Sequence, residues 1–387
     1  MRRLLMRLPA SVRVALRRSL AAAFGALGFF GVRRAARGKL SVAGSSVAAL
    51  ERALGPTAVS AVVTTDEPAP QPDLRFEHGP LIRPRPLQTV SVVVDSRDPR
   101  CSFRNNVALD HRRRVIAEER LARDELPVSF SMLEQATVRS GTVAYLSNTN
   151  VGNFYHWITL TLPLLRLYAE HGVGPDAYYL GRPVTAWHVE TLAMLGIDED
   201  RVISSGVTAD RLVTAVINRR HGAVDTASLR FVREQVGAPR FAAARTRRLV
   251  IGRGDVAFRR FVNEDECVDL LTRQFGFEYV TMDGKTVADE IELFSSAEAI
   301  VGVHGAALTN LLWAHPDCKV LELLPYGWNH PGYQELAAFV GCPYGYIVGS
   351  PDAPRAAGVD KPAAVRREND LLIDPSTLTA AVRALGV

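Results

Sequence analysis

The sequence lacks the cysteine patterns that mark disulfide frameworks and structural metal sites. Its four cysteines lie far apart, with no C-x-x-C pair and no metal-ligand spacing: Cys101, Cys267, Cys318 and Cys342. Isolated thiols of this kind are typical of small core residues in a reducing compartment, so we expect a cytoplasmic protein. No G-x-G-x-x-G motif follows any predicted strand, which disfavours a dinucleotide-dependent oxidoreductase.

Acidic residues are absent from the first 39 positions, although arginine and lysine recur there. The longest uncharged run of this segment, 19–32, is too short to span the ~30 Å of hydrocarbon in a bilayer. We expect residues 1–45 to form a basic helical leader on the surface, or a disordered one. The alternative is a helix that lies peripherally on the inner face of a membrane. No aromatic-plus-basic motif accompanies this charge, so we expect no nucleic-acid partner.

The length and the composition predict a soluble protein of two domains. The chain has 387 residues, of which 47% are hydrophobic and 22% are charged, and single cores stop growing at about 250–300 residues. Six prolines between 64 and 86 predict an extended connector. We expect a first domain at 46–238, a second at 239–365 and a C-terminal helix at 366–387.

Apolar runs with the periods of strands and helices alternate along both halves of the chain. In the first half, the predicted strands are 90–96, 142–147, 178–181, 201–204 and 212–217, and the predicted helices are 112–123, 154–171, 186–195 and 227–236. In the second half, the predicted strands are 248–252, 278–282, 299–303 and 319–324, and the predicted helices are 264–275, 287–296, 307–315 and 375–385. This order predicts an α/β fold of two Rossmann-like domains facing an interdomain cleft, with ligands at the carboxyl ends of the strands.

The stretch 299–325 has the pattern of an anion site. Its predicted strand, turn and helix would form a βαβ unit, in which free N–H groups at the start of the helix attract phosphate. Gly305 lacks a Cβ and, with Ala306, would let the backbone approach a ligand closely, while His304 would donate a hydrogen bond to it. Glu322 follows roughly 20 residues later, the offset at which an acidic residue reaches ribose hydroxyls. An ordinary βαβ unit with a tight turn explains this local pattern about equally well.

Three sequence blocks together resemble glycosyltransferase family 61. They are N-F-Y-H-W at 153–157, R-G-D-V-A-F-R-R-F-V-N-E at 253–264, and V-H-G-A-A-L-T-N at 303–310 with E-L at 322–323. The last block is the most specific, and the resemblance covers about residues 90–350. It implies a GT-B fold, in which the first Rossmann-like domain binds the acceptor, the second binds a nucleotide sugar, and the active site lies between them.

The resemblance also implies the chemistry. Family members are inverting transferases that use a nucleotide-diphosphate sugar, commonly UDP-linked, and a hydroxyl of an acceptor, here expected to be a glycan. Bacterial members are often capsular or exopolysaccharide transferases, so we expect a role in polysaccharide biosynthesis. The alternative is a catalytically silent nucleotide-sugar-binding or scaffold protein that kept the donor site and lost the base.

No metal and no bound cofactor are expected. Basic residues and helix N–H groups can neutralise a diphosphate without a cation. The sequence does contain a D-x-D pattern, at 198–200, but it falls in a short turn between a predicted helix and a predicted strand. We interpret it as a polar loop.

The candidate donor-binding residues lie in the second domain. Arg253 follows a predicted strand end, and Arg259 and Arg260 compete for one further phosphate contact, because guanidinium groups bind phosphate bidentately. Asn263 begins an N-x-x-E pattern, so a helix cap competes there with a donor contact. Asn310 lies one turn into the predicted helix and would face either the nucleotide or a neighbouring loop.

The candidate catalytic residues lie in the first domain. His156 is the candidate general base, because an inverting transferase needs one base near neutral pKa to take the acceptor proton. Asp95 and Asp110 are rival bases. Tyr155 and Trp157 are candidate acceptor-binding residues that could stack on a sugar face, although aromatics at helical spacing are more often part of the core.

Overall fold

The computed structural model describes residues 59–64, 73–79, 89–104, 106–109, 115–117, 135–148, 150–218, 225–254, 259–328, 331–353 and 370–387. The predicted leader at 1–45 and the rival base Asp110 lie outside these stretches. Among the described residues, no helix has both the length and the apolar character needed to cross a membrane.

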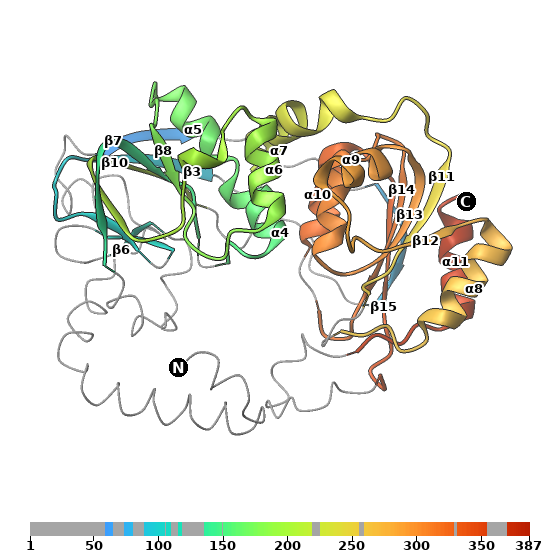
Figure 1. The fold of residues 1–387 in the computed structure, drawn as a ribbon. Helices are drawn as coiled ribbons and strands as arrows, with labels where there is room; N and C mark the ends of the chain where they lie inside the picture. Colours follow the sequence, from blue (N-terminus) through green and yellow to red (C-terminus); the bar gives the residue numbers. More distant parts are fainter. Residues whose placement is uncertain are drawn as a thin grey trace, which may run out of the picture.

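The first of two sheets is mixed and has nine strands (Figure 1). A parallel block runs in the order β10-β7-β8-β9 and comprises β7 Thr137–Tyr145, β8 Ala177–Tyr179, β9 Val202–Ile203 and β10 Val207–Asn218. The other strands pair antiparallel: β1 Val59–Thr64, β3 Thr89–Ser96, β4 Ser102–Arg104, β5 Val107–Leu109 and β6 Val115–Ala117.

The second sheet is entirely parallel and has the strand order β12-β11-β13-β14-β15-β2. Its strands are β2 Leu74–His78, β11 Arg247–Ile251, β12 Glu278–Val280, β13 Ala297–Val303, β14 Lys319–Leu324 and β15 Tyr344–Val348. The central strands are buried on both faces, as expected for parallel strands covered by helices. The predicted α/β class is confirmed, with sheets rich in parallel strands.

The helices form layers between and outside the sheets. In Figure 1, α4, α6 and α7 lie on the side of the first sheet that faces the second, α9 and α10 face them, and α8 and α11 cover the outer side of the second sheet. The α-helices are α4 Phe154–His156, α5 Leu164–Glu170, α6 Ala186–Met194, α7 Thr226–Val232, α8 Glu264–Phe275, α9 Val287–Ser295, α10 Gly332–Val340 and α11 Pro375–Ala384. Shorter 3₁₀ and π turns are η2 Trp157–Thr161, η3 Glu199–Arg201, η4 Arg233–Gly237, η5 Ala238–Arg240 and η6 Ala306–Trp313.

Several elements differ from the prediction for local reasons. The predicted helix 154–171, for which the sequence predicts a kink at Pro163 because its ring nitrogen cannot donate to the helix ladder, is broken there and also contains the π turn η2. The predicted helix 307–315 is the tighter 3₁₀ helix η6. Part of the predicted helix 112–123 is the strand β6, which pairs with β5.

The proline-rich stretch 64–86 contains a strand of the second sheet rather than connector alone. Residues 74–78 carry no proline, so β2 can pair in parallel with β15. The sequence analysis does not predict this strand, because the flanking prolines give the whole stretch the pattern of an extended linker.

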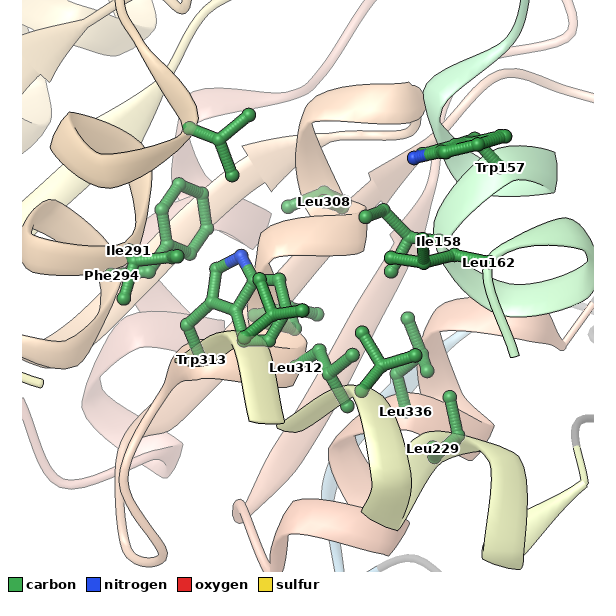
Figure 2. Close-up of a cluster of buried hydrophobic side chains, with 14 of the residues drawn as sticks. Trp157, Ile158, Leu162, Leu229, Ile291, Phe294, Leu308, Leu312, Trp313 and Leu336 are labelled. Carbon is green, nitrogen blue, oxygen red and sulfur yellow. The ribbon is translucent and has the colours of Figure 1, made fainter. Parts of the chain in front are cut away.

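One hydrophobic cluster extends from the helices of the first sheet to those of the second. Figure 2 shows Trp157, Ile158 and Leu162 on one side, and Leu308, Leu312 and Trp313 on the other. Full burial of a large apolar side chain stabilises a fold by roughly 1.5–3 kcal/mol, so this shared core holds the two helical layers in a fixed relation. As a consequence, α4 lies against the start of η6.

A polar contact adds to this core. Glu190 of α6 accepts hydrogen bonds from the backbone N–H groups of Val287, at 2.8 Å, and Ala288, at 2.9 Å, which open α9. A carboxylate at a helix N-terminus satisfies free N–H groups and interacts favourably with the helix dipole. Glu190 therefore links a helix of the first sheet to a helix of the second.

Candidate active site

Two loops at the same edge of the second sheet bring Arg253 and His304 together. Arg253 comes shortly after β11 ends, and His304 directly follows β13, its parallel neighbour. The carboxyl ends of parallel strands meet at one edge, where ligands of open α/β sheets bind. The Nη1 atom of Arg253 donates a hydrogen bond of 2.6 Å to the backbone carbonyl of His304.

Gly305 leaves room for this contact. Its φ of 176° is ordinary extended backbone, so conformational freedom is not the reason for glycine. A Cβ at this position would lie 2.4 Å from Nη1 of Arg253, closer than real contacts allow. The close approach predicted for a ligand at Gly305 and Ala306 is therefore made by an arginine of the protein itself, and Ala306 opens η6 beside it.

Glu322 is buried beneath His304. The Glu322 side chain is almost fully buried in β14, and its carboxylate bonds to Nδ1 of His304 through one oxygen and to the hydroxyl of Tyr344 through the other. A buried carboxylate needs such partners to offset the loss of hydration. Because both oxygens already have protein partners, the ribose contact predicted for Glu322 is replaced by a positioning contact with His304.

Aromatic rings surround the imidazole of His304. The ring centroid of Trp328 lies 4.4 Å from that of His304, and the centroid of Tyr333 lies 5.0 Å from it. The guanidinium carbon of Arg259 lies 5.1 Å from the centroid of the same Trp328 ring. Trp328 thus contacts both a candidate phosphate-binding arginine and the candidate histidine.

Trp328 and Tyr333 were missed by the sequence analysis. Trp328 lies in the loop after β14 and Tyr333 in the first turn of α10, in a stretch rich in glycine and proline for which the sequence predicts no element. The available signal was the concentration of aromatics in P-Y-G-W-N-H-P-G-Y at 325–333, directly after a strand end.

The electrostatics of this cluster favour an anion. Burial, followed by the nearby charge of Arg259, lowers the pKa of Arg253 to about 10. Burial also lowers the pKa of His304; Glu322 opposes this effect, while Arg259 and Arg253 add to it. The Nε atom of Arg253 is buried and has no hydrogen-bond partner among the described residues. Two guanidinium groups that repel each other, one with an unused donor, are suited to bind phosphate oxygens.

Arg260 and Asn263 serve the fold instead. Arg260 donates hydrogen bonds to the buried carboxylate of Asp370, the shortest at 2.6 Å from Nη2. Asn263 occupies the N-cap position of α8, but its side chain makes no capping bond. Its amide oxygen accepts from the backbone N–H of Ile373 at 3.2 Å, and its amide nitrogen donates to the carbonyl of Ile373 at 2.8 Å and to Oε2 of Glu266, the acid of the N-x-x-E pattern, at 3.1 Å. The donor contact and the side-chain cap predicted for Asn263 are thus replaced by attachment of 370–373 to the loop before α8.

The helix α4 brings two predicted residues to this cluster. The ring of Tyr155 meets the ring of Tyr333 edge to face at 5.5 Å, and the ring of His156 lies 5.6 Å from that of Tyr155. Since Tyr333 also contacts His304, rings connect α4 to the donor-side loops without a break. His156 is half-buried, so part of its surface is accessible. The structure therefore connects Tyr155 to His304 through Tyr333, with His156 beside Tyr155 on α4.

Trp157 does not join them. It is fully buried, and its Nε1 donates a 2.9 Å hydrogen bond to Oγ1 of Thr191. Its ring also packs against Trp187 and His188. The acceptor stacking predicted for Trp157 is wrong for this arrangement, because an indole that fills the core has no face left for a sugar.

Asn310 and Asp95 also make other contacts. Asn310 is fully buried; its amide nitrogen donates to Oε2 of Glu290 at 2.8 Å, and its oxygen accepts from Nε1 of Trp313 at 2.8 Å. The amide nitrogen of Asn310 also lies 3.9 Å from Sδ of Met282, so its polar contacts lie with the helix α9 and with the loop after β12. Asp95 forms an ion pair with Arg211 of β10, with an Nη2–Oδ2 distance of 2.7 Å, and its strand runs antiparallel to β10.

The predicted polar loop at 198–200 lies at the turn η3, and all three residues are exposed. Among the described residues, no three or more His, Cys, Asp or Glu side chains gather in a way that could hold a metal ion.

Comparison with known proteins covers the same region. Residues 154–321 match the model of the family described as Glycosyltransferase 61. Similar curated proteins are the protein O-linked-mannose beta-1,4-N-acetylglucosaminyltransferases 2 of Canis lupus familiaris, Homo sapiens and Mus musculus, each 33% identical over 94 residues. That segment is 23% of this chain and 16% of each relative, so the chain matches only a small part of their length. His156, Arg253, Arg259 and His304 all lie within the region of the family match.

Proposed function

Because this chain belongs to glycosyltransferase family 61, we propose that it transfers a sugar from a nucleotide-diphosphate donor to a hydroxyl group of a glycan acceptor. The observation that carries the proposal is the meeting of Arg253, Arg259 and His304 with the helix that bears His156. A cationic cluster beside a titratable group of near-neutral pKa is what such a displacement requires.

The donor diphosphate binds at the carboxyl ends of β11 and β13. Arg253 and Arg259 contact the phosphate oxygens, and His304 offers Nε2, since its Nδ1 is held by Glu322. These groups offset the negative charge that grows on the leaving diphosphate as the glycosidic bond breaks. Burial strengthens this interaction, because water screens it less than on an open surface.

His156 acts as the base in a direct displacement. The acceptor oxygen attacks the anomeric carbon as its proton passes to His156, and the bond to the β-phosphate oxygen breaks with its electron pair left on the nucleotide. One displacement inverts the anomeric configuration. The two sheets then serve as the two Rossmann-like domains of a GT-B enzyme, with the acceptor on the side of α4.

We propose a UDP-linked donor and a role in polysaccharide biosynthesis, in the cytoplasm or peripherally at the membrane. UDP-N-acetylglucosamine is the first donor to test, because the relatives named above are N-acetylglucosaminyltransferases. The family resemblance supports UDP as the nucleotide. Donor use without an added metal belongs to the same proposal, with Arg253 and Arg259 in place of a cation.

A donor screen followed by product analysis tests the function. Nucleotide sugars are ranked by isothermal titration calorimetry, and the best are incubated with candidate glycans or with water alone. Transfer of the sugar with inverted configuration, determined by NMR of the product, is the expected result. Donor binding with neither transfer nor hydrolysis would instead favour the silent binding protein, and failure of every donor to bind would overturn the proposal.

A further inference from the structure

The two ring nitrogens of His304 have different surroundings. Nδ1 bonds to the carboxylate of Glu322, which also accepts the hydroxyl of Tyr344. Nε2 makes no hydrogen bond to any residue that the structure describes, although the side chain is 6% exposed. One nitrogen is therefore fixed on an anion, and the other is available to a ligand.

The charges around this ring come from several elements. Arg253 and Arg259 approach from the loop after β11, Tyr333 from α10, and Glu322 and Tyr344 from β14 and β15; Glu264 of α8 lies beside Arg253. Without a ligand, burial and the two guanidinium groups disfavour a third positive charge, and together they outweigh Glu322. The imidazole is therefore neutral at neutral pH, with its proton on Nδ1 toward the carboxylate.

A bound diphosphate reverses this balance. Its negative charge offsets Arg253 and Arg259 and adds an attractive field at Nε2, while Glu322 is already in place to stabilise an imidazolium. Resting on the function proposed above, we propose that donor binding draws a proton from solvent onto Nε2 of His304, so that the donor diphosphate faces an imidazolium held by Glu322. A new N–H bond forms, the buffer supplies the proton, and no other bond changes.

Proton uptake makes donor affinity depend on pH. Between the lower pKa of His304 in the free protein and its higher pKa in the complex, up to about one proton is taken up for each donor bound. The association constant then rises as pH falls through this window, by up to about tenfold per pH unit. Above this window the imidazole stays neutral in both the free protein and the donor complex, so the association constant no longer depends on pH.

Calorimetry of the full chain measures this uptake directly. UDP-N-acetylglucosamine and UDP-glucose are titrated at about pH 7 in HEPES and in Tris, whose ionisation enthalpies differ. Their diphosphates are diesters that stay fully ionised in this range, unlike the terminal phosphate of UDP, so any buffer-dependent heat reports a protein group. We expect positive uptake for both sugars and none for uridine, which lacks the diphosphate.

The outcomes separate the two proposals. Donor binding with a buffer-independent heat overturns the proton linkage and leaves the proposed function intact, whereas failure of every nucleotide sugar in the donor screen to bind overturns both. Glu322→Gln tests whether the proton goes to His304. It removes the negative charge that faces Nδ1, so we expect the proton uptake to fall to near zero. Glu290→Gln is the control, because Glu290 is a partly buried acid outside this cluster whose pKa of about 7 lies near the measuring pH, and its removal should leave the uptake unchanged. Unfolding curves confirm that each variant is folded, and the wild-type measurement stands without them.

Discussion

The ring of Tyr155 meets the ring of Tyr333 edge to face, with centroids 5.5 Å apart and an angle of 80° between the planes. This contact joins α4, beside the first sheet, to α10, beside the second. Edge-to-face pairs contribute roughly 0.5–1.5 kcal/mol beyond the area that they bury. The pair therefore helps to fix the distance between His156 and the arginine cluster.

Loss of this ring pair should lower turnover more than donor affinity. In Tyr155→Leu the position of His156 is less restricted, so we expect kcat to fall by about tenfold, while the dissociation constant of the donor changes little. Steady-state kinetics and calorimetry measure the two effects. Tyr155→Phe is the control, since it keeps the ring and should stay close to wild type. A Phe variant as slow as the Leu variant would show that the hydroxyl, and not the ring contact, is needed.

Arg253 should recognise the diphosphate and not the nucleoside. Its buried Nε has no partner among the described residues, and its charge is opposed by Arg259. We expect Arg253→Ala to weaken UDP binding by a charge-assisted hydrogen bond, about 1.5–3 kcal/mol, and to leave uridine binding unchanged. Calorimetry with both ligands tests this.

Arg260→Ala is the matched control for Arg253→Ala. The guanidinium group of Arg260 is held by Asp370, so its loss should affect thermal stability and leave the affinity for UDP close to wild type. If each arginine variant weakens the binding of UDP and the binding of uridine by the same amount, the assignment of Arg253 to the diphosphate is wrong.

Much of the second sheet could be predicted from sequence, because its strands are short apolar runs and its helices carry clear end signals. The helix α8 and the strand β14 have the predicted bounds. The strand β15 is not predicted, since Y-G-Y-I-V contains a glycine and follows α10, a helix that the sequence analysis does not predict either. Without β15 the hydroxyl of Tyr344 could not be expected beside Glu322.

The role of Glu322 could not be predicted from its spacing to the glycine loop alone. An acidic residue about 20 residues after a glycine loop reaches ribose when it ends its strand. Here Glu322 is inside β14, paired with Gly302 on one side and Tyr346 on the other, and its carboxylate is buried. The sequence indicates that His304 and Glu322 belong to one site, but only packing decides that the acid binds the histidine.

His156 should be required for turnover and not for donor binding. It lies on α4, opposite the arginine cluster, so His156→Ala should leave the donor dissociation constant nearly unchanged. Loss of a general base costs about 10²–10⁴-fold in rate. Asp95→Asn is the comparison, because Asp95 is engaged with Arg211 and its loss should affect stability first. Near-normal turnover in His156→Ala together with an inactive Asp95→Asn would move the base to Asp95.

The last prediction concerns the partly buried acid Glu290 on α9. Its side chain accepts a hydrogen bond from Asn310, and its pKa is raised from an ordinary value of 4.5 to about 7, chiefly by burial. Asn310 opposes the rise, and the negative charge of Glu190 adds to it. The folded protein therefore binds the proton of Glu290 more tightly than the unfolded chain does.

Because the pKa is higher in the folded state, the stabilisation is fully present below about pH 4.5 and is lost as pH rises through about 7. The free energy of unfolding of wild type, relative to Glu290→Gln, should fall over this window by on the order of 2–3 kcal/mol and then level off. Urea unfolding across the pH range measures the difference. Asp289→Asn is the control. Hydrogen bonds with Thr286 lower the pKa of Asp289, the exposed neighbour of Glu290. Wild type should therefore not lose stability relative to Asp289→Asn as pH rises through the same window. A wild-type protein that tracks Glu290→Gln at every pH would show that Glu290 titrates normally and that water reaches its carboxylate in the folded state.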